Sequence, residues 1–287
     1  MAGGDDLESD DEYLDQSWLN KQEEVLVTLD ETIRKDDDEL RENNGSKKRG
    51  NSAILNDDEP EVSSKTKKPK NLLLEAGRGI SEANPDVQAA FLWTTFSHTL
   101  NLKGDNIDEV EKFTSSQFAT AKMIDTKKSK YEKSLATFLK GGVIKSMKKL
   151  KKWKEHNSPM VLVICVSARR AVALLKEISS LNVRAAKLFA KHMSVEDQIA
   201  MLDNNTYGIG VGTPNRLLKL FETGRDDKNE GGLSLAQTEL IIIDCQEDNK
   251  RFTVCTMNDT APDLMTLIHK AVLPQMSKRK NIKFAMF

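Results

Sequence analysis

The sequence has few of the residues on which metal sites, disulfide frameworks and membrane spans depend. Among 287 residues there are three cysteines and four histidines. No two cysteines form a C-x-x-C pair and the histidines are scattered, which argues against a zinc site and against a disulfide framework. No apolar run approaches the roughly 18 residues that a membrane span needs. The cysteine pattern indicates a reducing compartment, cytosol or nucleus. We further expect no metal, no cofactor, no membrane partner and no small-molecule substrate.

The net charge of −1 conceals a strong asymmetry along the chain. Residues 1–40 contain 15 acidic and 3 basic residues, whereas residues 121–155 contain 12 lysines and 3 acidic residues. Lysines at that density favour an anionic partner, nucleic acid first, because phosphates neutralise them. The alternative is a solvated basic surface. The stretch SMKKLKKWKEH predicts a helix that buries Met147, Leu150 and Trp153 and presents Lys148, Lys149, Lys151, Lys152 and Lys154.

Residues 1–70 predict a disordered tail, acidic and then basic, because too few apolar residues offset the entropy of ordering. Within it, an apolar cluster around Trp18 and Leu19 predicts a helix that docks on a partner; residual helix without a partner is the alternative. Ser9 precedes three acidic residues, as acidophilic kinases require. A basic cluster predicts a nuclear localisation signal or nucleic-acid contact, rather than a solvated linker; its lysines are Lys65, Lys67, Lys68 and Lys70.

After the tail we expect a helical, lysine-rich extension over residues 71–155 and an α/β domain over residues 156–287. In the domain, short β-rich runs alternate with amphipathic helices, which predicts a parallel sheet with helices on both faces. Functional residues of such sheets gather at the carboxyl ends of the strands. The runs expected to form strands are 160–166, 183–190, 207–213, 238–244 and 281–287.

The stretch ELIIIDCQED, residues 239–248, has the pattern of a buried strand ending in a Mg²⁺-binding aspartate. A nucleotide hydrolase of this kind also needs a glycine-rich phosphate cradle. The best match, LKGGVIKS, has Leu139 and Ile144 where glycines are required, so we interpret it as fortuitous. Asp244 is therefore expected to mark a retained fold rather than a metal or catalytic site. The glycines of GIGVG lie along a strand and predict close packing, and Cys165 is expected in the core.

The order of three stretches, VICVSARRA, VGTPNRLLKL and LIIIDCQED, resembles the first RecA-like domain of DEAD-box RNA helicases. The corresponding motifs of that family read PTRELA, TPGRL and DEAD, so the motifs here are degenerate, and we expect no second such domain. The resemblance implies a single RecA-like domain. It also places Arg169, Thr213 and Arg216 where that family contacts the RNA backbone, and Arg170, beside Arg169, is a further candidate for RNA binding. The alternative is structural: Thr213 caps a helix and Arg216 pairs with a carboxylate.

Residues 80–287, with VRAAKLFAKHMSVEDQ and NIKFAMF, more closely resemble the Cms family of small-subunit pre-ribosome proteins. This resemblance implies a non-catalytic ribosome biogenesis factor of the nucleolar 90S pre-ribosome, the small-subunit processome. Its expected partners are pre-rRNA or snoRNA and assembly proteins. The competing hypothesis is an atypical DEAD-box-like ATPase or RNA helicase.

Overall fold

The computed structural model describes residues 69–102, 110–121, 134–190, 193–224, 232–279 and 281–287. The chain divides into two compact units, Met1–Ala76 and Gly77–Phe287. In the first unit, the described part is helix α2 (Pro69–Ala76). The second unit holds every strand in the described part of the chain.

The second unit is built on a five-stranded sheet in which every pairing is parallel. The strand order is β2-β3-β1-β4-β5, so β1 lies at the centre between β3 and β4. The predicted parallel α/β sheet is confirmed, with each strand shorter than its apolar run. The strands are β1 (Val161–Ile164), β2 (Ala185–Leu188), β3 (Ile209–Gly212), β4 (Leu240–Ile243) and β5 (Lys283–Met286).

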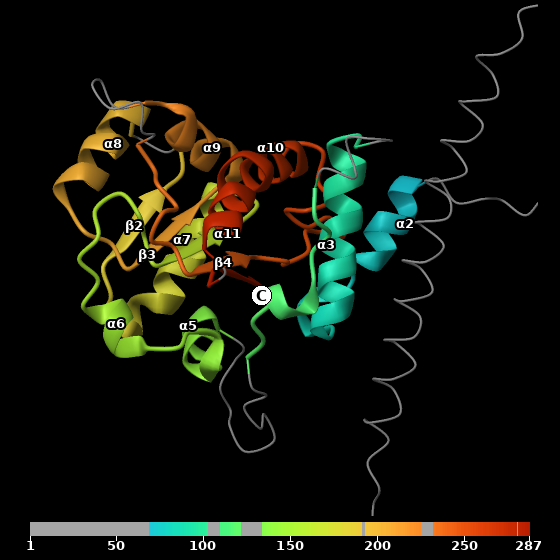
Figure 1. Ribbon diagram of the computed structural model, residues 1–287, viewed down its shortest axis with the longest axis horizontal. Helices are drawn as coiled ribbons and strands as arrows, with labels where there is room; N and C mark the ends of the chain where they lie inside the picture. The colour runs from blue at the N-terminus through green and yellow to red at the C-terminus, as the bar shows by residue number, and fades with distance from the viewer. Residues whose placement is uncertain (1–68, 103–109, 122–133, 191–192, 225–231, 280) are drawn as a thin grey trace, which may run out of the picture. The chain divides into compact units, whose positions relative to one another are not determined.

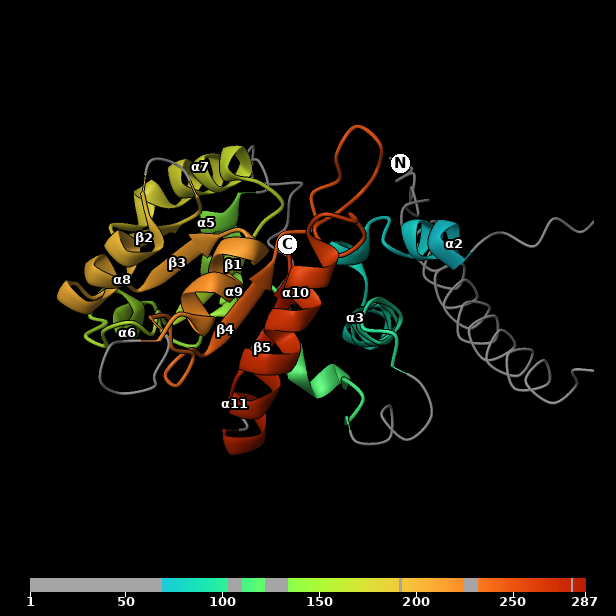
Figure 2. The same cartoon turned by 90° about the horizontal axis from the view of Figure 1, so that it is seen from above.

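Helices cover both faces of the sheet, with α7 on one side and α8, α9 and α10 on the other (Figure 2). Every strand-to-strand connection runs through a helix, as parallel neighbours require. α8 begins directly after Ser194, whose hydroxyl accepts a hydrogen bond from the Asp197 amide at 3.0 Å. These helices are α7 (Ala168–Glu177), extended by a 3-10 turn (Ile178–Leu181), α8 (Val195–Asn204), α9 (Pro214–Glu222), α10 (Ala261–Leu267), a π-turn (Ile268–Val272) and α11 (Leu273–Lys278).

The lysine-rich extension expected over residues 71–155 is not set apart from the sheet, because the compact unit begins at Gly77. Leu135, Leu139 and Leu150 share one buried cluster with strand residues such as Val163, and Phe118 pairs with Phe284 at the edge of β5. The elements of this segment are a 3-10 turn (Ile80–Glu82), α3 (Pro85–Thr99), a second 3-10 turn (Ser115–Gln117), α5 (Leu135–Phe138), a π-turn (Leu139–Val143) and α6 (Met147–Lys151).

Glycines on β3 let neighbouring elements approach the sheet closely, as the GIGVG pattern predicts. A Cβ atom built on Gly212 would lie 2.3 Å from the Leu188 carbonyl oxygen, and one on Gly210 would lie 2.9 Å from Leu188 Cδ1. Any side chain at Gly212 would therefore overlap the backbone of β2. LKGGVIKS forms no cradle after a strand: its first five residues are the π-turn, and Ser146 caps α6.

Among the helices in the described part of the chain, none combines the length and the apolar character needed to cross a membrane.

Candidate nucleic-acid interface

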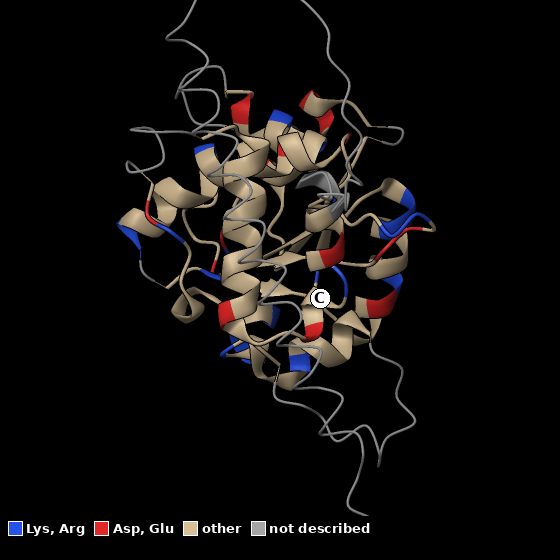
Figure 3. Ribbon diagram, turned by 90° about the vertical axis from the view of Figure 1, so that its right-hand side faces the viewer, with Lys and Arg blue, Asp and Glu red and all other residues tan. Residues whose placement is uncertain are grey.

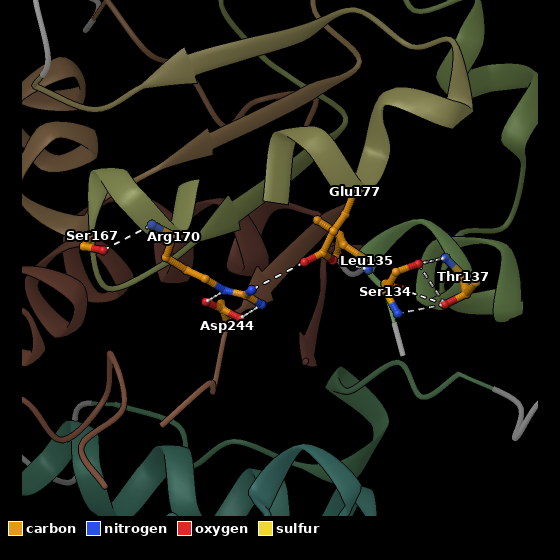
Figure 4. Close-up of polar contacts among 7 residues, drawn as sticks. All are labelled: Ser134, Leu135, Thr137, Ser167, Arg170, Glu177 and Asp244. Carbon is orange, nitrogen blue, oxygen red and sulfur yellow. Dashed lines mark hydrogen bonds and ion pairs between the residues drawn. The ribbon is translucent and has the colours of Figure 1, made fainter. Parts of the chain in front are cut away.

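An ion pair between Arg170 on α7 and Asp244 at the end of β4 lies at the carboxyl edge of the sheet, the edge at which the parallel strands end (Figure 4). Arg170 Nε lies 2.8 Å from Asp244 Oδ2, and Nη2 lies 2.9 Å from Oδ1, so both carboxylate oxygens accept hydrogen bonds. The Asp244 side chain is 1% exposed and that of Arg170 is 18% exposed. A carboxylate that is paired with a cation and accepts two hydrogen bonds from it can stay charged in the interior.

Glu177, at the end of α7, extends this pair toward α5 (Figure 4). Arg170 Nη1 lies 3.4 Å from Glu177 Oε1, and the Leu135 backbone amide donates to Glu177 Oε2 at 2.7 Å. Burial lowers the pKa of Arg170, but its hydrogen bonds to Asp244 and the charges of Asp244 and Glu177 raise it, and the net shift is upward. The guanidinium therefore remains a permanent cation that neutralises the carboxyl edge from within.

Arg216, predicted to contact RNA, is buried at 9% exposure. Its Nη1 donates to Gln198 Oε1 at 3.2 Å and to the Met193 carbonyl at 3.3 Å, so its partners are neutral oxygens rather than the carboxylate of the structural alternative. Thr213 occupies the N-cap position of α9, but its hydroxyl makes no capping hydrogen bond, contrary to that alternative. Thr213 is half-buried, and Arg169 is the exposed arginine of the predicted set.

The predicted basic helix is confirmed in part as α6, which ends at Lys151, so Lys152, Trp153 and Lys154 follow the helix instead of belonging to it. Leu150 is buried, and Met147 and Trp153 pack partly buried against the core, as the apolar stripe requires. Trp153 Nε1 donates to the Ser158 carbonyl at 2.8 Å, which anchors the indole. Exposed ammonium groups surround this apolar contact; they belong to Lys148, Lys149, Lys151, Lys152 and Lys154.

The predicted RNA-binding residues are divided between opposite edges of the sheet. Lys149 forms an ion pair with Glu239, which directly precedes β4, whereas Arg170 pairs with Asp244, which directly follows it. Glu239 and Asp244 are five residues apart along an extended chain, so their Cα atoms are separated by about 16 Å. The lysines of α6 and the arginines of α7 therefore belong to two separate surfaces.

The three thiols are all buried. Burial, with a further contribution from the charge of Asp244, raises the pKa of Cys165 to about 12. A hydrogen bond with Cys255 and then burial raise the pKa of Cys245. Neutral, inaccessible thiols are poor nucleophiles and poor metal ligands. In the described ranges, no group of three or more histidine, cysteine, aspartate or glutamate residues is arranged to hold a metal ion.

The residues predicted for phosphorylation, partner docking and nuclear import lie outside the described residues, and these roles stay predictions. They are Ser9, Trp18, Leu19, Lys65, Lys67 and Lys68, together with the side chain of Lys70.

Comparison with known proteins identifies the family. Residues 28–287 match the family model described as "CMS1: U3-containing 90S pre-ribosomal complex subunit". The chain belongs to this family. It is 30% identical over 157 residues to Protein CMSS1 of Xenopus laevis, which covers 54% of each chain. It is 29% identical over 157 residues to Protein CMSS1 of Homo sapiens, covering 54% of this chain and 53% of that one.

A fungal relative matches over a shorter stretch. Protein CMS1 of Chaetomium thermophilum is 33% identical over 122 residues, covering 41% of this chain and 46% of that one. The chain thus spans about half the length of the curated relatives that it matches. The resemblance inferred from the sequence is confirmed at the level of the family.

Proposed function

We propose that this protein is a non-catalytic ribosome biogenesis factor, a subunit of the nucleolar 90S pre-ribosome that binds pre-rRNA or snoRNA and assembly proteins. Family membership carries the proposal, because the matching model describes a U3-containing 90S pre-ribosomal complex subunit. The dense lysines of residues 121–155 support the RNA part of it, since cations at that density bind phosphates. The proposed fold is a RecA-like domain with degenerate helicase motifs.

The carboxyl edge supports a role without ATP turnover. In a nucleotide hydrolase of this architecture, the aspartate at the end of the strand must leave an oxygen free for Mg²⁺ or for water that binds it. Here both oxygens of Asp244 accept hydrogen bonds from Arg170, and the next residue is Cys245 rather than a carboxylate. Arg170 thus supplies the positive charge that a metal ion would otherwise bring to this buried carboxylate.

Cross-linking of the tagged protein to RNA in cells tests the RNA-binding role directly. We expect cross-linked reads in pre-rRNA or in a snoRNA, and co-sedimentation of the protein with 90S particles on a density gradient. A protein that sediments with the particle but gives no RNA cross-links would instead be a protein-bridging subunit. One that sediments apart from the particle would contradict the proposal altogether.

A titration with fluorescent ATP and Mg²⁺ tests the non-catalytic role. The expected result is no saturable binding at micromolar nucleotide and no phosphate release. Saturable binding with turnover would instead establish the competing hypothesis of an atypical ATPase.

A further inference from the structure

A second basic surface lies at the amino edge of the sheet, around α6. Leu150 on α6 lies against Gly208, the residue that directly precedes β3, so closely that a Cβ atom on Gly208 would lie 2.7 Å from the Leu150 carbonyl oxygen. The Gly208 amide in turn donates to the Arg184 carbonyl, just ahead of β2, at 3.0 Å. His156, after α6, bridges to Thr206 ahead of β3. Residues that precede three different strands therefore meet at this edge.

Most of the positive charge on this amino-edge surface is not cancelled locally. Lys149 is paired with Glu239. Among the described residues, no ion pair involves the other exposed lysines of the surface, which are Lys148, Lys151, Lys152 and Lys154. Arg184 donates to the neutral Asn205 side chain at 2.7 Å, so its charge also persists. On the side that holds α3, basic and acidic segments are instead interspersed (Figure 3).

The aromatic rings of this surface are already covered by cations. Lys149 Nζ lies 5.6 Å from the Trp153 ring centroid, and Arg184 lies 5.4 Å from that of Tyr207. Cation–π contacts of this kind hold the cation over one face of each ring. Trp153 is further anchored through its indole nitrogen. The surface therefore presents ammonium and guanidinium groups rather than open rings on which unpaired bases would stack.

We propose that this amino-edge surface, Lys148, Lys151, Lys152, Lys154 and Arg184, is where the protein binds the phosphodiester backbone of RNA. The assignment rests on the RNA-binding role proposed above and locates it. It differs from the sequence expectation, which divides the contact between α6 and the carboxyl-edge residues Arg169, Thr213 and Arg216. It also adds Arg184, because only the fold brings the start of β2 beside α6. Contacts to phosphates alone predict strong salt dependence and little base preference.

The test measures binding of the full chain to a fluorescent RNA hairpin by anisotropy across a salt series. The amino-edge variant carries Lys148→Gln, Lys151→Gln and Lys152→Gln. The control carries Lys112→Gln, Lys219→Gln and Lys278→Gln, three exposed lysines on other elements, so both lose the same charge.

We expect the amino-edge variant to bind at least about tenfold more weakly at low salt, with a slope of log affinity on log salt reduced by roughly 2 to 3. The control should keep most of the affinity. Arg184→Gln should weaken binding, and Arg184→Lys should restore it, because the contact needs a positive charge rather than the paired N–H donors of a guanidinium group. Thermal unfolding checks that each variant is folded.

Three outcomes overturn the assignment while leaving the RNA-binding role intact: equal losses in the amino-edge and control variants, a loss confined to Arg169→Gln, or Arg184→Lys failing to restore binding. Tighter binding of polyglutamate than of the RNA at equal charge concentration would point instead to an acidic protein segment as the natural occupant. Wild-type protein that binds no RNA at any salt concentration contradicts the RNA-binding role itself, and the assignment fails with it.

Discussion

Arg170 holds Asp244 by two parallel hydrogen bonds across the carboxyl edge of the sheet, at 2.8 and 2.9 Å. The pair joins the helix after β1 to the end of the neighbouring β4. Because Asp244 is almost completely buried, loss of its partner would leave a charge without compensation in the interior. The carboxylate that follows the buried strand β4 is thus bound on both oxygens by a guanidinium of this chain.

The first prediction concerns the energy of this pair. Arg170→Met and Asp244→Asn should each lower the free energy of unfolding by about 3 kcal/mol, and the double variant should lose less than the sum. Lys270 and Glu222 provide a matched control, because their ion pair has a similar length, 2.6 Å, but the side chains are 52% and 43% exposed. The corresponding variants, Lys270→Met and Glu222→Gln, should cost less than about 1 kcal/mol. Denaturant unfolding measures all of these values, and additive effects at Arg170 and Asp244 would contradict the coupling.

A second prediction separates structural from RNA-binding arginines. Arg216→Ala should lower the free energy of unfolding by about 2 kcal/mol, because Gln198 and the Met193 carbonyl then lose their charged partner. The salt dependence of RNA binding should remain that of the wild type, since a buried guanidinium releases no counterions. A reduced salt slope in a variant that remains folded would show that Arg216 reaches phosphate after all.

The third prediction tests the close approach of β2 and β3. Gly212→Ala should destabilise the protein by at least about 2 kcal/mol, because the new methyl group would overlap the Leu188 carbonyl. Gly224→Ala is the control, since a Cβ atom there meets nothing within 4 Å, and it should change stability by less than about 0.5 kcal/mol. Thermal or denaturant unfolding measures the loss of stability in each variant. Equal losses in Gly212→Ala and Gly224→Ala would contradict the close packing of β2 and β3.

The fold could be predicted from the sequence more fully than the candidate nucleic-acid interface, for a physical reason. Strand runs such as LIIID and caps such as Ser194 are local patterns, so they can be identified without knowing which elements meet. The pairing of Arg170 with Asp244 depends on β1 lying beside β4, and the grouping of Arg184 with α6 depends on the order β2-β3-β1. The strand order cannot be read from the spacing of residues in the sequence. The resemblance could therefore suggest RNA-binding roles for arginines, but it could not predict which residues Arg170 and Arg184 contact.

The fourth prediction follows from the buried thiol of Cys165, whose pKa is raised to about 12 from an ordinary value of 9.0. Below about pH 9 the thiol is protonated in both states and adds no pH dependence. Between about pH 9 and about pH 12 the unfolded chain loses this proton and the folded one keeps it, so stability falls as pH rises. The loss from this group is at most about 4 kcal/mol. Between about pH 9 and about pH 12 the free energy of unfolding, measured with denaturant, should fall less steeply with pH in Cys165→Ala than in the wild type. The same slope in both proteins would contradict the raised pKa of Cys165.

The final prediction concerns the acidic residues 1–40, which carry 15 acidic against 3 basic side chains. A segment of that charge, tethered to a domain with exposed lysines, competes with RNA for the same cations at high effective concentration. Deleting residues 1–40 should therefore tighten RNA binding at low salt, and Ser9→Glu, which mimics part of a phosphate's charge, should weaken it slightly. A charge-neutral tail of equal length, with the aspartates and glutamates replaced by asparagine and glutamine, is the control for bulk. It should bind as tightly as the deletion; affinity that is the same in all of these proteins would show that the tail does not screen the lysines.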